Sequence, residues 1–273
     1  MPSLAEDKSE FLGTAFRAAM LAGNCILKNI GKISQNEIDT KQASDFVTRV
    51  DKESESLILS IIGKKYPDHH FLAEETVHDA DSGQYRWIID PLDGTTNFIH
   101  SYPAFSISIA LQHHGEIILG LVYDPLRDEI FSSEKGKGSY LNGNPIRISF
   151  NTEMKNSLIA TGFPFRQKGV LDAYLAVFKK IFFKVSDIRR AGSAALDFAN
   201  LACGRCDGFF EIGLGPWDIA AGSLLITEAG GVVTDFGGGT DYLSTGNVVA
   251  GVPEVHRELL KDVQSIFGNT ISR

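Results

Sequence analysis

One run of the sequence, residues 87–98, joins a buried strand to a pair of acids. It begins with the apolar Trp87-Ile88-Ile89 and continues as Asp90-Pro91-Leu92-Asp93-Gly94-Thr95-Thr96-Asn97-Phe98. Pro91 fixes one corner of a turn and Gly94 frees the next, so we expect the two carboxylates to converge above the strand end. Carboxylates that close repel each other unless a cation lies between them. The run therefore predicts a metal site, with a solvated turn that caps a helix as the alternative.

Further acids occur where they can join this pair. Glu74 and Glu75 end a short apolar run, so Glu74 is expected at a strand terminus beside Asp90. Asp218 follows Pro216 in the first turn of a helix expected over 217–229, where the helix dipole favours a carboxylate whatever its function. All-oxygen ligands, including the Leu92 carbonyl, favour magnesium first and manganese second. Each acid alone has a structural explanation, but together they predict a metal centre.

The composition excludes several functional classes. The chain has 273 residues, of which 43% are hydrophobic, and a formal net charge of −8 with no cluster of basic residues. Direct nucleic-acid binding through a basic face is therefore not expected. No apolar stretch reaches the roughly 18 residues of a membrane span, and the acidic start is unlike a signal peptide, so we expect a cytoplasmic protein that does not bind membranes. Cys203 and Cys206 are interpreted as a helix end, and the two His-His pairs at 69–70 and 113–114 as loops.

Hydrophobic periodicity predicts an α+β protein whose second half is α/β. Two helices are expected over 11–26 and 51–65, with a polar loop at 39–44 between them, followed by strands over 87–90, 105–111, 117–123 and 129–133 and turns at 136–138 and 141–145. From residue 157 onward strands and helices alternate. We expect an N-terminal α+β subdomain over 1–150, with a mixed or antiparallel sheet and most metal ligands. An α/β subdomain over 151–273 is expected to supply Asp218 and the substrate contacts.

Three segments, in their order and spacing, resemble the signatures of the inositol monophosphatase family. They are Glu74-Glu75, the run from Asp90 to Phe98, and Trp217-Asp218 with Glu228-Ala229-Gly230-Gly231. The segments 161–165, 190–195 and 207–211 resemble its bacterial branch, and Ala73 stands where many members have Gly. The resemblance covers nearly the whole chain. It implies the layered α-β-α-β-α sugar-phosphatase fold, a homodimer, and a magnesium-dependent, lithium-sensitive phosphatase that hydrolyses inositol 1-phosphate to inositol and phosphate.

The resemblance also implies roles for individual residues. Two or three Mg²⁺ ions, replaceable by Mn²⁺, are expected on Glu74, Asp90, Asp93, Asp218 and the Leu92 carbonyl. Asp51 and Thr95, with Glu74, are expected to orient and deprotonate water. Substrate contacts are expected from Asp93, Gly94, Thr95, Gly192, Ser193, Ala194, Glu211 and Asp218. The alternatives are that Asp51 is the N-cap of the following helix and that Glu211 is an exposed strand end.

Other functions stay open. Arg189 and Arg190, with Arg166 and Lys168, offer charges for a second phosphate, so fructose 1,6-bisphosphatase or a broader sugar phosphatase is the runner-up. Relatives in the bacterial branch are implicated in a transcription complex with RNA polymerase, which makes such a complex a possible partner. The sequence has no basic or heptad-patterned segment to support that role. A metal-binding pseudoenzyme is disfavoured because every candidate ligand is present.

Overall fold

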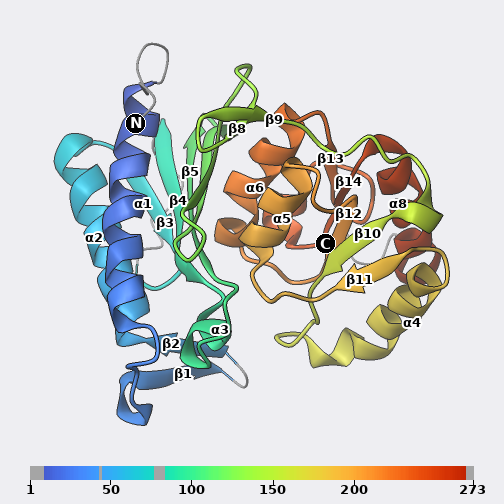
Figure 1. Ribbon diagram of the computed structural model, residues 1–273, viewed down its shortest axis with the longest axis horizontal. Coiled ribbons are helices and arrows are strands. Elements are labelled where there is room, and N and C mark those ends of the chain that lie inside the picture. The colour runs from blue at the N-terminus through green and yellow to red at the C-terminus, as the bar shows by residue number, and fades with distance from the viewer. Residues whose placement is uncertain (1–8, 43–44, 77–83, 269–273) are drawn as a thin grey trace.

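The protein is built from five stacked layers. The computed structural model describes residues 9–42, 45–76 and 84–268. In Figure 1 a pair of helices, a large sheet, a second pair of helices, a smaller sheet and a third pair of helices follow one another across the molecule. The expected α-β-α-β-α arrangement is therefore confirmed.

The first two layers form the N-terminal side. Helices α1 (Glu10–Asn29) and α2 (Arg49–Lys65) cover one face of the larger sheet. The buried face of α1 is built from small residues at helical spacing, among them Ala15, Ala18 and Ala22, which allow the helix to lie close to its neighbours. The sheet contains, in spatial order, β3 (His70–Ala73), β4 (Tyr85–Asp93), β5 (Ser106–His113), β6 (Glu116–Asp124), β7 (Glu129–Glu134), β8 (Ser139–Leu141) and β9 (Asn144–Ile146). Among the described strands of this sheet, only β3 and β4 pair in parallel, so the sheet is mixed as expected.

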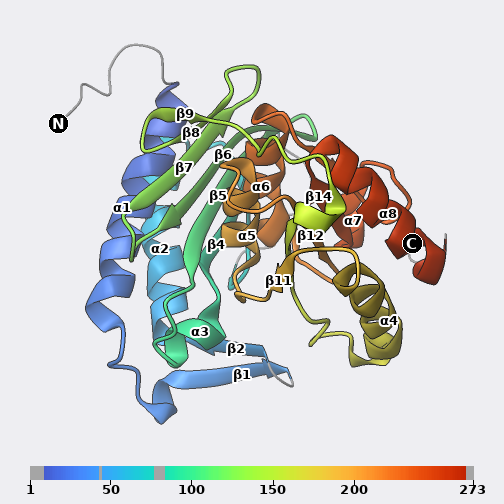
Figure 2. The same ribbon diagram turned by 45° about the vertical axis from the view of Figure 1, so that its right-hand side comes forward.

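The remaining layers come from the C-terminal half. Helices α5 (Ala194–Ala202) and α6 (Pro216–Glu228) lie between the two sheets, as Figure 2 shows from a second direction. The smaller sheet has the order β11 (Asp187–Arg189), β10 (Leu158–Thr161), β12 (Gly208–Glu211), β14 (Val248–Gly251) and β13 (Val232–Thr234). Helices α4 (Leu171–Phe182) and α8 (Pro253–Phe267) cover its outer face. Short elements complete the chain: β1 (Ile38–Gln42), β2 (Asp45–Thr48), α3 (Thr95–Ile99) and α7 (Tyr242–Thr245).

The two halves share a hydrophobic core. Every strand of the larger sheet precedes residue 150 and every strand of the smaller sheet follows it. However, Ile88 and Val122 of the larger sheet pack in one cluster with Phe198 of α5 and Leu225 of α6. Burial of this shared apolar surface holds the halves together. The division at residue 150 stays a prediction about subdomains, since the middle helices contact both sheets.

Several local expectations require correction. Residues 39–44 were expected as a loop, but residues 39–42 belong to β1, which pairs antiparallel with β2, and residues 43–44 lie outside the described residues. The segment 141–145 contributes to β8 and β9 as well as to a turn. The histidine pairs do not lie wholly on loops, because His70 begins β3 and His113 ends β5. His69 stacks between Tyr66 and Tyr85, with ring centroids 4.8 and 4.6 Å away.

The segment with Cys203 lies at the end of a helix. Cys203 is the C-cap of α5 and Gly204 follows with a φ of +76°, as expected for a helix end. Across the described ranges no helix is both long and apolar enough to cross a lipid bilayer.

Candidate active site

A β-bulge brings the two acids of β4 to one side of the sheet. Asp90 pairs with Ser108 of β5 and Asp93 pairs with Ser106, so three steps along β4 match two steps along β5. In a regular strand, residues three apart point to opposite faces, and one extra residue restores a common face. The turn expected at Pro91 is therefore wrong. The strand continues through Asp93, and the bulge rather than a turn makes the carboxylates converge.

Glu74 reaches the same place through the parallel pairing of β3 with β4. Ala73 is opposite Ile89, and the Glu74 N–H donates to the Ile89 carbonyl at 3.2 Å. The two strands therefore end side by side, and Glu74 lies at the strand terminus next to Asp90 as the apolar run predicts. Its carboxylate lines the same pocket as Asp90 and Asp93.

Asp218 belongs to the C-terminal half of the chain and lies beside the acids of β4. It is the third residue of α6, and its Oδ2 accepts a hydrogen bond from the Gly215 N–H at 2.6 Å. The Trp217 carbonyl accepts a hydrogen bond from Ser108 Oγ at 2.9 Å, which fixes the start of α6 against β5. One carboxylate oxygen from each of Asp90, Asp93 and Asp218 lies within 4.8 Å of the other two. We call these three residues the acid cluster.

The acid cluster is buried and electrostatically strained. Burial, followed by the charges of Glu74, Asp93 and Asp218, raises the pKa of Asp90 well above its ordinary value. Burial raises the pKa of Asp93 to about 6, although hydrogen bonds from Ser193 and Ala195 oppose the shift. Burial and the charges of Asp93 and Glu74 raise the pKa of Asp218 to about 7. Three buried carboxylates at this separation require protons or a cation to relieve their repulsion.

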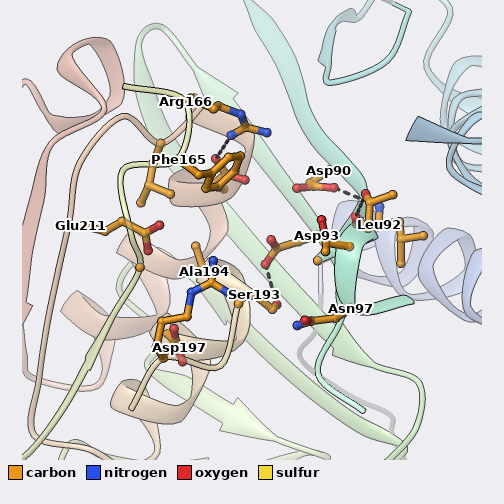
Figure 3. Close-up of a pocket in the computed structure, with 18 of the residues that line it drawn as sticks. Asp90, Leu92, Asp93, Asn97, Phe165, Arg166, Ser193, Ala194, Asp197 and Glu211 are labelled. Atoms are coloured by element: carbon orange, nitrogen blue, oxygen red, sulfur yellow. Dashed lines mark hydrogen bonds and ion pairs between the residues drawn. The ribbon is translucent and has the colours of Figure 1, made fainter. Parts of the chain in front are cut away.

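One arginine lies against the acids. Arg166 Nη2 is 3.5 Å from Glu74 Oε1, and Arg166 Nη1 is 4.0 Å from Asp218 Oδ2. Its guanidinium also lies over the Phe165 ring at 4.9 Å from the centroid, which restrains it (Figure 3). Arg166 lowers the pKa of Asp218, but burial and the neighbouring acids outweigh it.

The donor set fits a hard divalent cation. Every member of the acid cluster offers carboxylate oxygen, which suits Mg²⁺ or Mn²⁺, and this group contains no His or Cys of the kind that zinc prefers. Glu74 and the backbone of Leu92 line the same pocket and can complete the coordination. The buried, mutually repelling acids thus match the chemistry of the expected metal.

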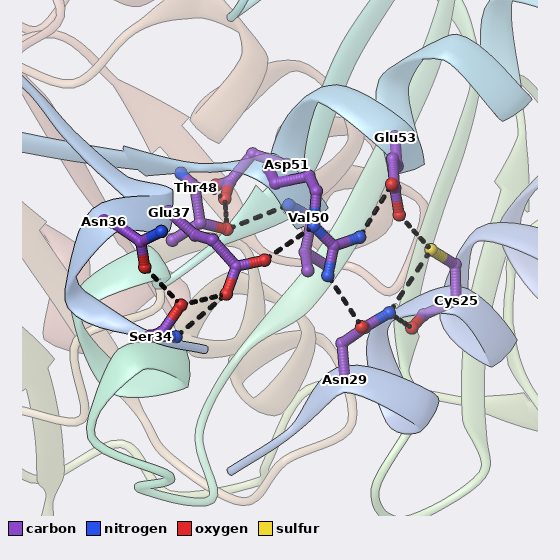
Figure 4. Close-up of polar contacts among 10 residues, drawn as sticks. Cys25, Asn29, Ser34, Asn36, Glu37, Thr48, Val50, Asp51 and Glu53 are labelled. Atoms are coloured by element: carbon purple, nitrogen blue, oxygen red, sulfur yellow. Dashed lines mark hydrogen bonds and ion pairs between the residues drawn. The ribbon is translucent and has the colours of Figure 1, made fainter. Parts of the chain in front are cut away.

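Asp51 and Thr95 are in direct contact. Thr95 Oγ1 donates to Asp51 Oδ1 at 2.7 Å and lies 3.2 Å from the Leu92 carbonyl. The other oxygen of Asp51 accepts from the N–H of Thr48 at 2.9 Å and from Thr48 Oγ1 at 2.5 Å (Figure 4). The alternative interpretation, in which Asp51 is the N-cap of α2, is therefore wrong. Thr48 is the N-cap, and Asp51 closes a capping box from the third helical position. Burial raises the pKa of Asp51 to about 6.

Gly94 allows the chain to leave β4 and begin α3. Its φ is +97°, in the region that favours glycine, and a Cβ there would lie 2.9 Å from the Ala104 carbonyl oxygen and 3.2 Å from that of Gly192. Asn97 Nδ2 donates to the carbonyls of Ala104 at 2.6 Å and Ala191 at 2.9 Å. These contacts hold the start of α3 against the loop before α5.

The loop before α5 is tied to the acid cluster. Ser193 is the N-cap of α5, and its Oγ donates to Asp93 Oδ2 at 2.6 Å, while the Ala195 N–H donates to the same oxygen at 2.8 Å. The Ser193 hydroxyl was expected to face substrate, but it is fully buried and also contacts Ser106 Oγ at 3.2 Å. Gly192, Ser193 and Ala194 all line the pocket.

Most of the predicted site residues line one pocket of about 270 Å³. Glu211, at the end of β12, is buried in its wall, so the alternative of an exposed strand end is wrong. A Cβ on Gly162 would collide with the Glu211 carboxylate, so glycine there makes room for that side chain. The site residues placed in the pocket by the structure are Glu74, Asp90, Leu92, Asp93, Gly94, Thr95, Gly192, Ser193, Ala194, Glu211 and Asp218.

Sequence reasoning assigned no role to several other pocket residues. Asp197 follows Ser193 by four positions, so helical spacing places both on one side of α5. Asn97 also lines the pocket and lies in the run from Asp90 to Phe98, but that run alone did not give it a role. Phe46 lines the pocket too, and no pattern in the sequence singles it out. Arg189, in contrast, is exposed and pairs with Asp187 at 2.5 Å, outside the pocket lining.

Known proteins resemble the chain over almost its full length. It is 46% identical over 263 residues to the Nus factor SuhB of Escherichia coli, covering 96% of this chain and 98% of that protein. The crystal structure of the extragenic suppressor protein suhB from Bartonella henselae superposes with a TM-score of 0.90 at 39% identity, covering 94% and 99% of the two chains. The structure of inositol monophosphatase from Anabaena matches with a TM-score of 0.84 at 38% identity, covering 94% and 96%.

The family assignment agrees with the residues described above. The sequence model of the inositol monophosphatase family matches residues 7–267, a range that includes both sheets and every member of the acid cluster. The chain therefore belongs to the inositol monophosphatase family.

Proposed function

We propose that this protein is a magnesium-dependent phosphomonoesterase that hydrolyses inositol 1-phosphate to inositol and phosphate. The observation that carries the proposal is the acid cluster, whose three buried carboxylates lie within 4.8 Å of one another at one end of a pocket. An anionic protein with such a site attracts a phosphate ester only when divalent cations reverse the local charge. Family membership and the likeness to the Anabaena inositol monophosphatase support the choice of reaction.

The proposal assigns the metal-binding role to residues from both halves of the chain. Glu74, Asp90 and the Leu92 carbonyl would hold one ion, and Asp90, Asp93 and Asp218 a second, so Asp90 is shared. Bound Mg²⁺ supplies charge neutralisation, an activated water and stabilisation of the departing alkoxide.

Other residues of the site would position the substrate and deprotonate the attacking water. Asp51 accepts the Thr95 hydroxyl hydrogen bond at 2.7 Å, so the Thr95 oxygen would accept a proton from the attacking water while its own hydroxyl proton passes to the Asp51 carboxylate. Glu74 lines the same pocket as Thr95, and its charge contributes to the raised pKa of Asp51. The backbone of Gly94 and Thr95 would hold phosphate oxygens. Glu211 and the backbone of Gly192 and Ala194 would face the ring hydroxyls, while the Ser193 hydroxyl would hold Asp93 in place.

A magnesium titration tests the proposal. Phosphate release from inositol 1-phosphate is expected to rise from baseline with Mg²⁺, to be partly supported by Mn²⁺, and to be inhibited by lithium. The Asp93→Asn variant is expected to be inactive at every concentration, since it removes an acid-cluster carboxylate. Flat activity across the titration in the unmodified protein would reject the mechanism.

A bisphosphatase is the second candidate within enzymes. Arg190 lines the pocket and offers one cation for a second phosphate, whereas Arg189 is paired with Asp187 and Arg166 lies against Glu74. Relative kcat/KM values for inositol 1-phosphate, fructose 1,6-bisphosphate and adenosine 3′,5′-bisphosphate separate the candidates. A preference for either bisphosphate would replace the first choice.

The name of the Escherichia coli relative favours a further candidate from another class. That protein is a Nus factor, and 46% identity makes a place in a transcription complex our second proposal for this chain. Its test is complementation of a strain that lacks its own SuhB: normal growth with the Asp93→Asn variant would assign the physiological role to binding. Homodimer formation and a cytoplasmic location stay predictions, and light scattering of the purified protein tests the first.

A further inference from the structure

A second pair of buried carboxyl groups forms the wall of the pocket away from the acid cluster. Asp197 comes from the first turn of α5 and Glu211 from the end of β12, and their residues are 4% and 7% exposed. Figure 3 shows both on the opposite side of the pocket from Asp90 and Leu92. Neither belongs to the acid cluster.

Asp197 lacks the partners that a buried carboxylate normally has. Within the described part of the chain, no hydrogen-bond donor reaches its side chain, and its backbone N–H is used in the helix by the Ser193 carbonyl at 3.1 Å. A buried polar group without partners is costly, and such groups gather where a ligand completes them. A position in the pocket lining fits that explanation.

The charges around the two acids are unbalanced. Burial and then the proximity of Asp197 raise the pKa of Glu211, and burial followed by the Asp93 charge raises that of Asp197. Arg190 lowers the pKa of both Asp197 and Glu211, but one positive charge cannot neutralise two carboxylates. Its guanidinium lies over the Phe163 ring at 5.9 Å from the centroid. This wall of the pocket therefore favours neutral hydrogen-bond donors over anions.

We propose that Asp197 is a specificity-determining residue, which accepts a hydrogen bond from a hydroxyl of a polyol monophosphate and excludes a second anionic group from that end of the pocket. The inference rests on the proposed phosphatase function and names the substrate class of the same site. A hydroxyl supplies the donor that the Asp197 carboxylate lacks. A second phosphate would bring only negative charge and further acceptors to a wall that already holds two acids.

The test compares three substrates in the wild-type protein and the Asp197→Asn variant. Inositol 1-phosphate carries hydroxyls and one phosphate, fructose 1,6-bisphosphate carries hydroxyls and a second phosphate, and p-nitrophenyl phosphate carries neither hydroxyls nor a second phosphate. For the variant we expect KM for inositol 1-phosphate to rise about tenfold with kcat changed by less than about twofold, the size of one lost charged hydrogen bond. The ratio of kcat/KM for the bisphosphate to that for inositol 1-phosphate is expected to rise at least about tenfold. Values for p-nitrophenyl phosphate are expected to stay at the wild-type level.

The outcomes distinguish the inference from the proposed function. Absence of inositol 1-phosphate turnover in the wild-type protein rejects the proposed function and this inference with it. If the wild-type protein hydrolyses inositol 1-phosphate, two results for the Asp197→Asn variant overturn only the role of Asp197. One is an unchanged ratio of kcat/KM between the substrates, and the other is an equal loss of activity on all three substrates. Asp187→Asn, at an exposed aspartate outside the pocket, is the matched control and should match the wild type. Asp197→Ser removes the same charge in a smaller side chain and replaces the amide variant if the latter does not fold.

Discussion

The hydroxyl of Thr95 donates a hydrogen bond to Asp51 at 2.7 Å, across 44 positions of the sequence. The same aspartate caps α2 through Thr48, so its carboxylate is held from two sides. A side chain fixed in this way keeps the Thr95 oxygen in one orientation, which is what a group that accepts a proton from water requires.

Removing that hydroxyl is expected to slow the chemical step. For Thr95→Val we expect kcat for inositol 1-phosphate to fall about 100-fold with little change in KM, the usual range for one general acid–base group. Thr95→Ser keeps the hydroxyl and should recover most of the activity. Steady-state kinetics at saturating Mg²⁺ provide the measurement, and equal kcat values for the Val and Ser variants would argue against the role.

The metal should stabilise the fold through Asp218. In the unmodified protein, Mg²⁺ is expected to raise the thermal unfolding midpoint, because ions bind the gathered acids of the folded state more tightly than the dispersed acids of the unfolded chain. Asp218→Asn should abolish most of this increase in the unfolding midpoint and lower the activity at least about 100-fold. Asp187→Asn is the control, since that aspartate is exposed and pairs with Arg189. A normal Mg²⁺-induced increase in Asp218→Asn would contradict the assignment.

The stability of the metal-free protein should depend on pH. Burial raises the pKa of Asp93 to about 6 and that of Asp218 to about 7. Because these values exceed those of the unfolded chain, the folded state binds more protons, and these groups lower the free energy of unfolding as pH rises from about 4 to about 7. Magnesium binding needs the ionised acids, so the stabilisation by Mg²⁺ should grow over the same interval. Thermal unfolding at pH 5.5 and 8 with EDTA or Mg²⁺ measures both trends, and a pH-independent effect of Mg²⁺ would count against them.

Arg166 is expected to compete with the metal. Its guanidinium lies 3.5 Å from Glu74 and 4.0 Å from Asp218, so it partly neutralises acids that a cation needs. For Arg166→Gln we expect Mg²⁺ to bind about threefold to tenfold more tightly at pH 8, the effect of one partly screened charge. Calorimetric titration of the protein with Mg²⁺ measures the affinity directly. Arg205→Gln, at an arginine paired with Glu129, should leave that affinity unchanged. Weaker binding to the Arg166 variant would mean that the arginine supports the metal.

Gly94 and Gly115 form a matched pair for testing the tight start of α3. Both have a positive φ, but a Cβ on Gly94 would meet the Ala104 carbonyl oxygen at 2.9 Å, whereas nothing lies within 4 Å of a Cβ on Gly115. Gly115→Ala should cost about 1 kcal/mol for the backbone conformation alone. Gly94→Ala should cost about 1 to 3 kcal/mol more because the neighbouring backbone must move. Urea unfolding gives both values, and equal costs would show that the close approach is readily relieved.

The sequence identified the acids but not the backbone geometry that gathers them. Apolar runs ending in Glu74 and Asp90 predicted two neighbouring strand ends, and parallel pairing of β3 with β4 places them so. The Pro and Gly around Asp93 suggested a turn, because a bulge depends on how β5 pairs with β4, which local propensity does not encode. The short strands β8 and β9 overlap segments for which the sequence predicted turns, because three-residue strands have too few side chains to reveal a period.

Burial of lone polar side chains was the least predictable property. The sequence context of Glu211 suits an exposed strand end, but tertiary packing buries it in the pocket wall. The sequence context of Asp51 suits a helix cap, and Asp51 does close the capping box of α2, but its contact with Thr95 depends on tertiary packing. Asp197 shares this problem, since an aspartate in the first turn of a helix is common for electrostatic reasons alone. Its distance of four residues from Ser193 became informative only when the Ser193 contact with Asp93 was known.

The bulge in β4 makes the length of one short segment a condition for activity. Asp93 points toward Asp90 only because one more residue stands on β4 than on β5 between their pairing partners. Inserting one residue beside Leu92, with the bulge retained, would turn the second carboxylate to the side covered by α1 and α2, among apolar side chains. Homologous enzymes that retain this chemistry should thus tolerate substitutions at 91 and 92 far better than the insertion of a residue between the two aspartates.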